Sequence, residues 1–346
     1  MSKIKLLVVD NSSVMRHMIT NIVNERETLG VIGTASNGKD ALLKSEALNP
    51  DVIVMDLHMG EYDGIYALKE IMKTKTPKPI ILLSSSENEH MESELEALNA
   101  GAFDCVNKPV NNRIKLREIA DELYQKIEAA YQTDISVLVN RVPIGKNVSP
   151  HTFTEQLPYD IVLIGASTGG PAAIEKIVSN IPINLSTPII IAQHMPSNFI
   201  SSYAKRLERI GHKEVIIAQA GKIVERGKIY ILPGDKNTVL VKKEGQVKFS
   251  IAVKKYPFYN HPSVDALFTS AVEIYEDKII ASLLTGMGKD GANGLKLIKK
   301  RGGLTIAQSQ ETCVVYGMPK SAVDQDAVNY SLNIEMIAPF IISALS

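Results

Sequence analysis

Strand-sized apolar runs alternate with segments of helical period along most of the chain. In the first third, five such runs each precede a segment in which apolar residues recur every three to four positions: IKLLVV, VIGTA, DVIVM, PIILL and FDCV. Repeated strand and helix units build parallel sheets covered by helices. The pattern therefore predicts an α/β domain with a doubly wound parallel sheet.

The same alternation resumes at Ile161 and continues towards the end of the sequence. Helical stretches near 199–210, 264–276 and 294–301 interrupt the apolar runs IVLI, PIIIAQ, EVIIA, KIYIL, TVLVK, VKFSIAV, IIASLL and LTIA. A hairpin is expected around Asp235 to Gln246, because two alternating runs there flank a polar segment. We expect a second α/β domain, Rossmann-like and carrying this β-hairpin.

Between the two alternating regions, the stretch from about 132 to 158 holds three prolines and no sustained period. Such composition is typical of a linker. A chain of 346 residues is also long enough for about two domains. We therefore predict one domain over 1–128, a linker over 129–158 and a second domain over 159–346.

Composition and charge exclude several classes of function. Lys+Arg and Asp+Glu balance at 38 each, so no bulk field attracts nucleic acid or anionic lipid. No apolar run approaches the length of a membrane span, and the sequence MSKIKLLVVD lacks the layout of a signal peptide. The two cysteines, Cys105 and Cys313, lie in apolar segments and suit buried free thiols. We expect a cytoplasmic protein without nucleic-acid binding or membrane insertion.

In the first domain, polar side chains follow the predicted strands. Asp10 follows the first strand, Asp56 the third, Ser84 the fourth and Lys108 the fifth. Because reactive groups gather at the carboxyl ends of parallel strands, these four can form an acidic pocket for Mg²⁺ and a phosphoryl group. Any one of them could instead cap the next helix.

These residues resemble the pocket of a response-regulator receiver domain, and the likeness covers residue 4 to about 125. The resemblance implies a flavodoxin-like fold and a histidine kinase of chemotaxis as phosphodonor. It also implies that Asp56 accepts the phosphoryl group, Asp10 holds Mg²⁺ with it, Ser84 is the switch hydroxyl and Lys108 binds the phosphate.

Two positions depart from the receiver pattern. Asn11 stands where a second acid is expected, and its neutral amide would weaken Mg²⁺ binding compared with a carboxylate. Gly60, in LHMGEYDG, stands where proline is usual and leaves that backbone less constrained.

In the second domain, the segment IVLIGASTGGPAAI runs from an apolar strand through a glycine-rich turn into a helical pattern. A Walker phosphate loop would need a lysine after the glycines, and a dinucleotide fingerprint would need glycine in place of Ser167. Gly165 to Gly169 is instead a G-x-S-x-G motif, which presents a serine at a helix N-terminus. The Thr168 amide would then be a potential oxyanion donor, while a plain N-cap serine is the alternative.

A nucleophilic serine needs a base, and the base needs an orienting acid. His194 follows the strand PIIIAQ directly. The candidate acids are Asp235, readable as a hairpin-turn residue, Asp265, readable as a helix-borne residue, and Asp290, which follows IIASLL across a glycine loop. Asp290 is favoured because its strand end can share a crevice with Ser167 and His194.

Residues 159 to about 345 resemble the catalytic domain of the chemotaxis protein-glutamate methylesterases, the CheB family. The likeness lies in IGASTGGP, AQHMP, HPSVDALF, LLTGMGKDGA and CVVYGMPKSA. It implies a catalytic triad of Ser167, His194 and Asp290, and places Met287 at the oxyanion site. Asn237 departs from the histidine common in the family, outside this triad.

The resemblance implies hydrolysis of glutamyl methyl esters on methyl-accepting chemoreceptors, with deamidation of receptor glutamines and no cofactor for the ester chemistry. A receiver ahead of the esterase implies control by phosphorylation. Two rival functions stay open: a receptor-docking adaptor that has lost catalysis and, with less support, a nucleotide-binding enzyme.

Overall fold

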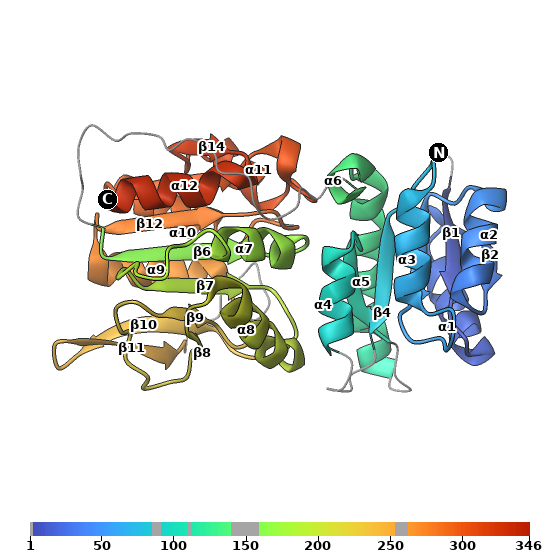
Figure 1. Ribbon diagram of the computed structural model, residues 1–346, viewed down its shortest axis with the longest axis horizontal. Helices are drawn as coiled ribbons and strands as arrows, with labels where there is room; N and C mark the ends of the chain where they lie inside the picture. The colour runs from blue at the N-terminus through green and yellow to red at the C-terminus, as the bar shows by residue number, and fades with distance from the viewer. Residues whose placement is uncertain (1–2, 85–90, 109–112, 140–158, 253–261) are drawn as a thin grey trace. The chain divides into compact units, whose positions relative to one another are not determined.

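The computed structural model describes residues 3–84, 91–108, 113–139, 159–252 and 262–346 (Figure 1). The chain divides into two compact units, Met1–Val142 and Pro143–Ser346. Each unit is a parallel-sheet α/β fold.

The first unit is built around a five-stranded sheet in the order β2-β1-β3-β4-β5, with every adjacent pair parallel. The strands are β1 (Ile4–Val9), β2 (Leu29–Ala35), β3 (Val52–Asp56), β4 (Ile80–Ser84) and β5 (Asp104–Asn107). The helices are α1 (Ser13–Asn24), α2 (Gly38–Leu48), α3 (Gly64–Lys73), α4 (Met91–Asn99) and α5 (Arg113–Gln132). This strand order is the flavodoxin-like one, as predicted.

Local sequence explains where these elements begin. Strands β3 and β4 are buried along their whole length, which suits apolar runs in a sheet covered on both faces. Three of the helices start at a side chain that accepts a backbone N–H of the first turn: Ser12 for α1, Asn37 for α2 and Asp63 for α3.

The second unit contains a seven-stranded parallel sheet in the order β14-β13-β12-β6-β7-β9-β8. Its strands are β6 (Ile161–Ala166), β7 (Ile189–Gln193), β8 (Val215–Ile217), β9 (Ile229–Ile231), β12 (Ile279–Leu283), β13 (Leu304–Gln308) and β14 (Tyr330–Leu332). Its helices are α7 (Gly170–Val178), α8 (Ser197–Gly211), α9 (Val264–Tyr275), α10 (Ala292–Lys300), α11 (Met318–Asp324) and α12 (Ile334–Leu345).

The helices of this unit form two groups. Helix α7 contacts α8 and α12 on one face of the sheet, whereas α10 contacts α9 and α11 on the other (Figure 1). From β6 the chain proceeds to β7 on one side, while the later strand β12 pairs with β6 on the other. The order of the strands therefore reverses at β6, and ligands of open α/β sheets bind at such a switch point, outside the carboxyl ends of the strands.

A two-stranded antiparallel hairpin accompanies this sheet, as predicted. It pairs β10 (Thr238–Lys243) with β11 (Gln246–Ile251). The turn is formed by Glu244 and Gly245, both with positive φ, as a tight two-residue hairpin requires. The interpretation of Asp235 as a hairpin-turn residue was wrong, because Asp235 lies in the preceding turn between β9 and β10.

The predicted linker is only partly described. Helix α5 continues to Gln132, and a short helix α6 (Ile135–Val139) follows, with Leu138 buried. Residues 140–158 lie outside the described part, so the boundaries of the linker stay a prediction.

Two further expectations concern the whole chain. Cys105 and Cys313 are both free, as predicted, and the expected burial is confirmed for Cys313, whereas Cys105 is half-buried. Within the described residues, no helix combines the length and apolar character needed to cross a membrane.

Candidate active site

Ser167 lies directly beyond the end of β6, in the tight turn that leads into α7. Its backbone N–H donates to the Thr285 carbonyl at 3.0 Å. The N-cap of α7 is Gly169, with φ 77°, and no side chain caps this helix. The alternative that Ser167 is a plain N-cap serine was therefore wrong.

His194 leaves the sheet beside Ser167. Ala166 and Gln193 are in register at the ends of β6 and β7, and the His194 N–H donates to the Ala166 carbonyl at 3.0 Å. Ser167 and His194 are thus the next residues after a paired position on adjacent parallel strands.

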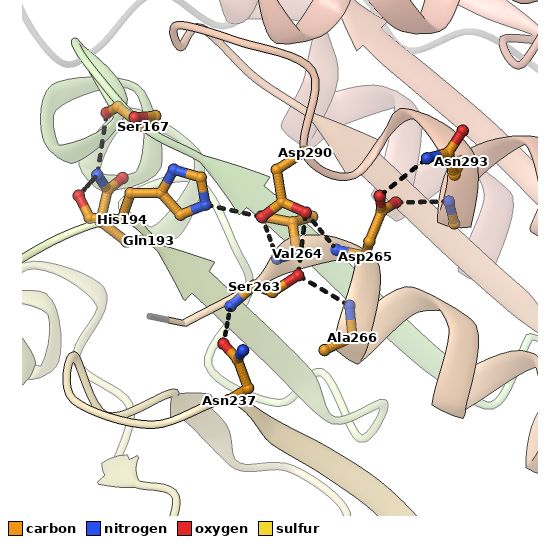
Figure 2. Close-up of polar contacts among 11 residues, drawn as sticks. Ser167, Gln193, His194, Asn237, Ser263, Val264, Asp265, Ala266, Asp290 and Asn293 are labelled. Atoms are coloured by element: carbon orange, nitrogen blue, oxygen red, sulfur yellow. Dashed lines mark hydrogen bonds and ion pairs between the residues drawn. The ribbon is translucent and has the colours of Figure 1, made fainter. Parts of the chain in front are cut away.

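Asp290 contacts His194 from the loop after β12. The Nε2 atom of His194 lies 2.9 Å from Oδ2 of Asp290, and Asp290 is 1% exposed. The edge of the imidazole that carries Nδ1 lies on the side of Ser167 (Figure 2). The three predicted triad residues therefore come together at the carboxyl ends of β6, β7 and β12.

The carboxylate of Asp290 is held by the N-terminus of α9. It accepts the backbone N–H groups of Val264 at 2.6 Å and Asp265 at 3.0 Å, and the Ser263 hydroxyl at 3.0 Å (Figure 2). Burial alone would raise the pKa of Asp290, but the contacts with His194 and these backbone donors outweigh it and lower the pKa. Asp290 is thereby kept ionised and fixed in orientation, as an acid that orients a catalytic histidine requires.

The other two candidate acids face elsewhere. Asp265 accepts the Gly294 N–H at 2.7 Å and the Asn293 amide at 3.3 Å, at the start of α10. Burial, together with the nearby charge of Asp290, raises the pKa of Asp265 to about 6. Asp235 is exposed and lies 3.6 Å from the Lys236 ammonium. Of the three acids, Asp290 is the one in contact with His194.

The residues predicted for the oxyanion site, Thr168 and Met287, both lie next to groups that adjoin Ser167. Thr168 follows it in the chain, and the Thr168 carbonyl accepts the Thr285 hydroxyl at 2.9 Å. Met287 follows Gly286, where an added Cβ would stand only 2.7 Å from the Ser167 Cβ. The absence of a side chain at Gly286 thus lets the loop that carries Met287 pack directly against Ser167.

Two residues of this cluster were missed from the sequence. Ser263 caps α9 by accepting the Ala266 N–H at 3.2 Å, and its own N–H donates to the Asn237 side chain at 2.7 Å (Figure 2). A serine just before the apolar run VDALF is an N-cap signal that could have found it. Gln193 is a lone polar residue at the end of an otherwise apolar strand, and it is buried at 1% exposure.

In the first unit, Asp10 and Asp56 converge on Lys108. The Lys108 ammonium lies 2.7 Å from Oδ2 of Asp56 and 3.2 Å from Oδ2 of Asp10. Both carboxylates are almost fully buried, and burial raises the pKa of Asp10. The predicted strand-end pocket is therefore present.

The donors of this pocket fit a small, hard cation. Because two carboxylate oxygens already approach one ammonium, the same oxygens can approach Mg²⁺, which commonly takes one or two carboxylates and completes its shell with water. Asn11 is exposed, and its backbone carbonyl accepts Arg16 at 3.3 Å. The described part of the chain has no cluster of three or more His, Cys, Asp or Glu suited to a metal. Mg²⁺ binding stays a prediction.

Ser84, at the end of β4, donates its hydroxyl to Oε1 of Glu94 at 2.6 Å. Glu94 is fully buried, and burial raises its pKa to about 7. Glu94 was not predicted as a site residue, although the helical period places it on the same helix face as Met91, Leu95 and Leu98, a spacing typical of a buried face.

The second departure from the receiver pattern also has a structural reason. Gly60 is exposed and adopts φ 91°. Proline is fixed near φ −65°, so it could not take this backbone conformation.

Comparison with known proteins agrees with both units. A family model described as CheB methylesterase matches residues 162–341, and one described as response regulator receiver domain matches residues 6–121. A protein-glutamate methylesterase/protein-glutamine glutaminase of Thermotoga maritima is 40% identical over 95% of each chain. A protein of the same name from Archaeoglobus fulgidus is 39% identical over 92% of each chain.

Among solved structures, the crystal structure of the Thermotoga maritima CheB methylesterase catalytic domain is 41% identical to this chain, with a TM-score of 0.51. The match covers 53% of this chain and 96% of that one. The predicted fold class and the predicted enzyme class are thus confirmed at the level of the family. The chain belongs to the CheB methylesterase family, with a response regulator receiver domain ahead of the methylesterase domain.

Proposed function

We propose that this chain hydrolyses glutamyl methyl esters on chemoreceptors, releasing methanol and restoring the carboxylate. The observation that carries the proposal is the 2.9 Å contact between His194 and Asp290, beside Ser167 on the adjacent strand end. The names of the relatives support the same substrate. We place the reaction in the cytoplasm, as expected from the sequence.

The chemistry follows from the three side chains. His194 accepts the hydroxyl proton while Oγ of Ser167 attacks the ester carbonyl carbon, and Asp290 stabilises the imidazolium that forms. The tetrahedral intermediate expels the methoxy group, which takes the proton from His194 and leaves as methanol. Water then attacks the acyl-enzyme through the same histidine, which frees Ser167 and the glutamate carboxylate. No cofactor is needed for these steps.

The oxyanion of each tetrahedral intermediate needs hydrogen-bond donors in place before the reaction. We assign this role to the backbone N–H groups of Thr168 and Met287, since Thr168 adjoins Ser167 and Gly286 packs against it. One such donor is worth on the order of 10² to 10³ in rate.

The same groups support a second substrate. A glutamine side-chain amide meets Ser167 as an ester does, with ammonia in place of methanol as the leaving group. We therefore propose deamidation of receptor glutamines as a further activity of this site, in line with the names of the relatives.

The receiver unit supports control by phosphorylation. A chemotaxis histidine kinase would supply the phosphoryl group to Asp56, and Lys108 would bind its oxygens. Asp10 and Asp56, with Asn11 as a third, uncharged donor, would hold Mg²⁺, which neutralises phosphoryl charge when it is bound. Phosphorylation would then relieve an inhibition that the receiver imposes on the esterase.

The test is methanol release from methylated chemoreceptor membranes by the wild type and by Ser167→Ala. We expect the variant to lose roughly 10⁴-fold or more in rate, because the triad residues act as a unit. Retention of most of the turnover would remove Ser167 from the mechanism. A wild type that binds receptor membranes but releases no methanol would support the adaptor instead.

A further inference from the structure

Gln193, the last residue of β7, connects the two loops that carry the proposed nucleophile and base. Its Nε2 donates to the Ser167 carbonyl at 2.9 Å and to the His194 carbonyl at 2.8 Å (Figure 2). A primary amide has two N–H groups, so this side chain can serve both carbonyls at once. One buried amide thus bridges Ser167 and His194.

The bond to Ser167 fixes a whole peptide unit. The peptide between Ser167 and Thr168 is planar and trans, so its C=O and its N–H point in opposite directions. Gln193 and the Gly170 N–H, at 2.8 Å, both hold the C=O of this unit. Holding that carbonyl therefore sets the direction of the Thr168 N–H, the group assigned to the oxyanion.

The bond to His194 acts on the base in the same way. The His194 N–H is held by Ala166 and its carbonyl by Gln193, so both peptide units that flank the residue are fixed. The imidazole is then oriented by Asp290 at its far edge. The backbone of His194, the proposed base, is therefore held in one conformation by hydrogen bonds on both sides.

The environment of Gln193 favours this single orientation. An added Cβ on Gly170 would stand 2.1 Å from Oε1 of Gln193, so the side chain packs tightly against the first residue of α7. A rotated amide would turn Oε1 against two carbonyl oxygens and lose both bonds. Oε1 is buried, and none of the described residues hydrogen-bonds to it, which costs stability. That cost is offset by the two hydrogen bonds from Nε2, both of which go to carbonyls of the site.

We propose that Gln193 is a positioning residue for the reaction, aiming the Thr168 N–H and aligning Ser167 with His194. The proposal rests on the acyl-enzyme function proposed above. Since a correctly aimed oxyanion donor acts chiefly in the transition state, its loss should lower kcat and leave KM almost unchanged.

The test compares Gln193→Met and Gln193→Glu with wild type, with Ser167→Ala and with the control Lys213→Met. Methionine fills a similar volume without donors, and glutamate keeps the shape but has at most one donor, so it cannot serve both carbonyls. Lys213 is buried and donates to two backbone carbonyls, of Ile183 at 2.9 Å and Leu185 at 2.8 Å, so Lys213→Met removes the same number of bonds in the same unit.

We expect both Gln193 variants to lose about 10- to 100-fold in kcat for methanol release, with KM within about twofold of wild type. Lys213→Met should lower the unfolding temperature but keep wild-type kcat. If the Gln193 variants also keep wild-type kcat while Ser167→Ala is inactive, the positioning role is overturned and the proposed function stands. If Ser167→Ala is as active as wild type, the proposed function fails, and the inference fails with it.

Discussion

Two buried aspartates sit side by side at this site, and their surroundings push their pKa values apart. Asp290 contacts His194 and accepts hydrogen bonds from two backbone N–H groups. These contacts lower the pKa of Asp290 despite its burial. For Asp265, burial and the charge of Asp290 dominate, and its pKa rises to about 6. Groups of one type with diverging pKa values mark a division of roles. Asp290 is the ionised partner of the base, and Asp265 anchors the neighbouring helix start.

Glu94 offers a prediction at the same scale. Its pKa of about 7 in the folded protein exceeds the ordinary value of 4.5, so between these pH values the folded state binds more protons than the unfolded state. Stability therefore falls as the pH rises through this window, by up to roughly 3 kcal/mol. Glu94→Gln keeps an acceptor for Ser84 and removes the charge. We expect its stability relative to wild type to grow from pH 4.5 to pH 8.

The measurement is hydrogen exchange of the β4 amides at several pH values, which reports opening around Ser84. The matched control is Glu92→Gln on the same helix, where the side chain is exposed and no pH-dependent gain is expected. A difference between Glu94→Gln and wild type that stays constant with pH would show that Glu94 titrates normally.

At the scale of elements, the N-termini of α9 and α10 are linked by two aspartates, and each helix donates backbone N–H groups to the aspartate at the start of the other. Asp290, just before α10, accepts the first N–H groups of α9, while Asp265, in the first turn of α9, accepts the Gly294 N–H of α10. Negative charge is favourable at a helix N-terminus, so each helix start stabilises the acid of the other. The orientation of Asp290 is therefore coupled to the packing of these two helices.

Ser263→Ala tests this coupling. The hydroxyl accepts from Ala266 as the N-cap of α9 and donates to Asp290, so its removal affects helix and site together. We expect a loss of about 1 to 2 kcal/mol in stability and of about 10-fold in kcat. Thermal unfolding and methanol release measure the two effects, with Ser263→Thr as the control that keeps a hydroxyl. Unchanged kcat in a destabilised Ser263→Ala would mean that the backbone donors orient Asp290 without the serine.

Elements with a clear period or a strand-sized apolar run could be predicted from the sequence, and others could not. Helix α12, IEMIAPFIISAL, is apolar almost all round and contains Pro339, so it lacks the one-sided period that identifies a helix. Strand β14 has only three residues, which is too short for a recognisable period, and it is a strand because it pairs with β13. The hairpin was predicted, but its turn was not located, because Asp235 and Gly245 both lie in turn-forming sequence.

At the scale of the molecule, the candidate triad joins residues from three separate parts of the sequence. They could be predicted because each follows an apolar strand, and such strand ends meet at one edge of a parallel sheet. The pairing of β12 with β6, which brings Asp290 to His194, is a long-range contact that no local pattern reveals. The positions of Gln193 and Glu94 indicate burial, but their partners, Ser167 with His194 and Ser84, are contacts of the folded chain that no local pattern reveals.

The last prediction concerns the two units together. If the receiver inhibits the esterase until Asp56 is phosphorylated, a fragment beginning at Tyr159 should release methanol faster than the unphosphorylated full chain. The solved catalytic domain that this chain resembles matches 53% of this chain over 96% of its own length, so it holds little besides the methylesterase domain. A domain of that extent folds without a receiver there, which supports a fragment of this chain that folds alone. Coupling between sites typically changes affinity by about 5- to 150-fold, so we expect an activation within that range.

A small-molecule phosphodonor with Mg²⁺ should activate the full chain but leave the fragment unchanged, and Asp56→Asn should abolish the response of the full chain. Equal rates for fragment and full chain would refute inhibition by the receiver. Activation by phosphodonor with equal basal rates would instead mean that the phosphorylated receiver stimulates the esterase. Because Asn11 contributes no charge to the pocket, a response that requires unusually high Mg²⁺ is the expected signature of this chain.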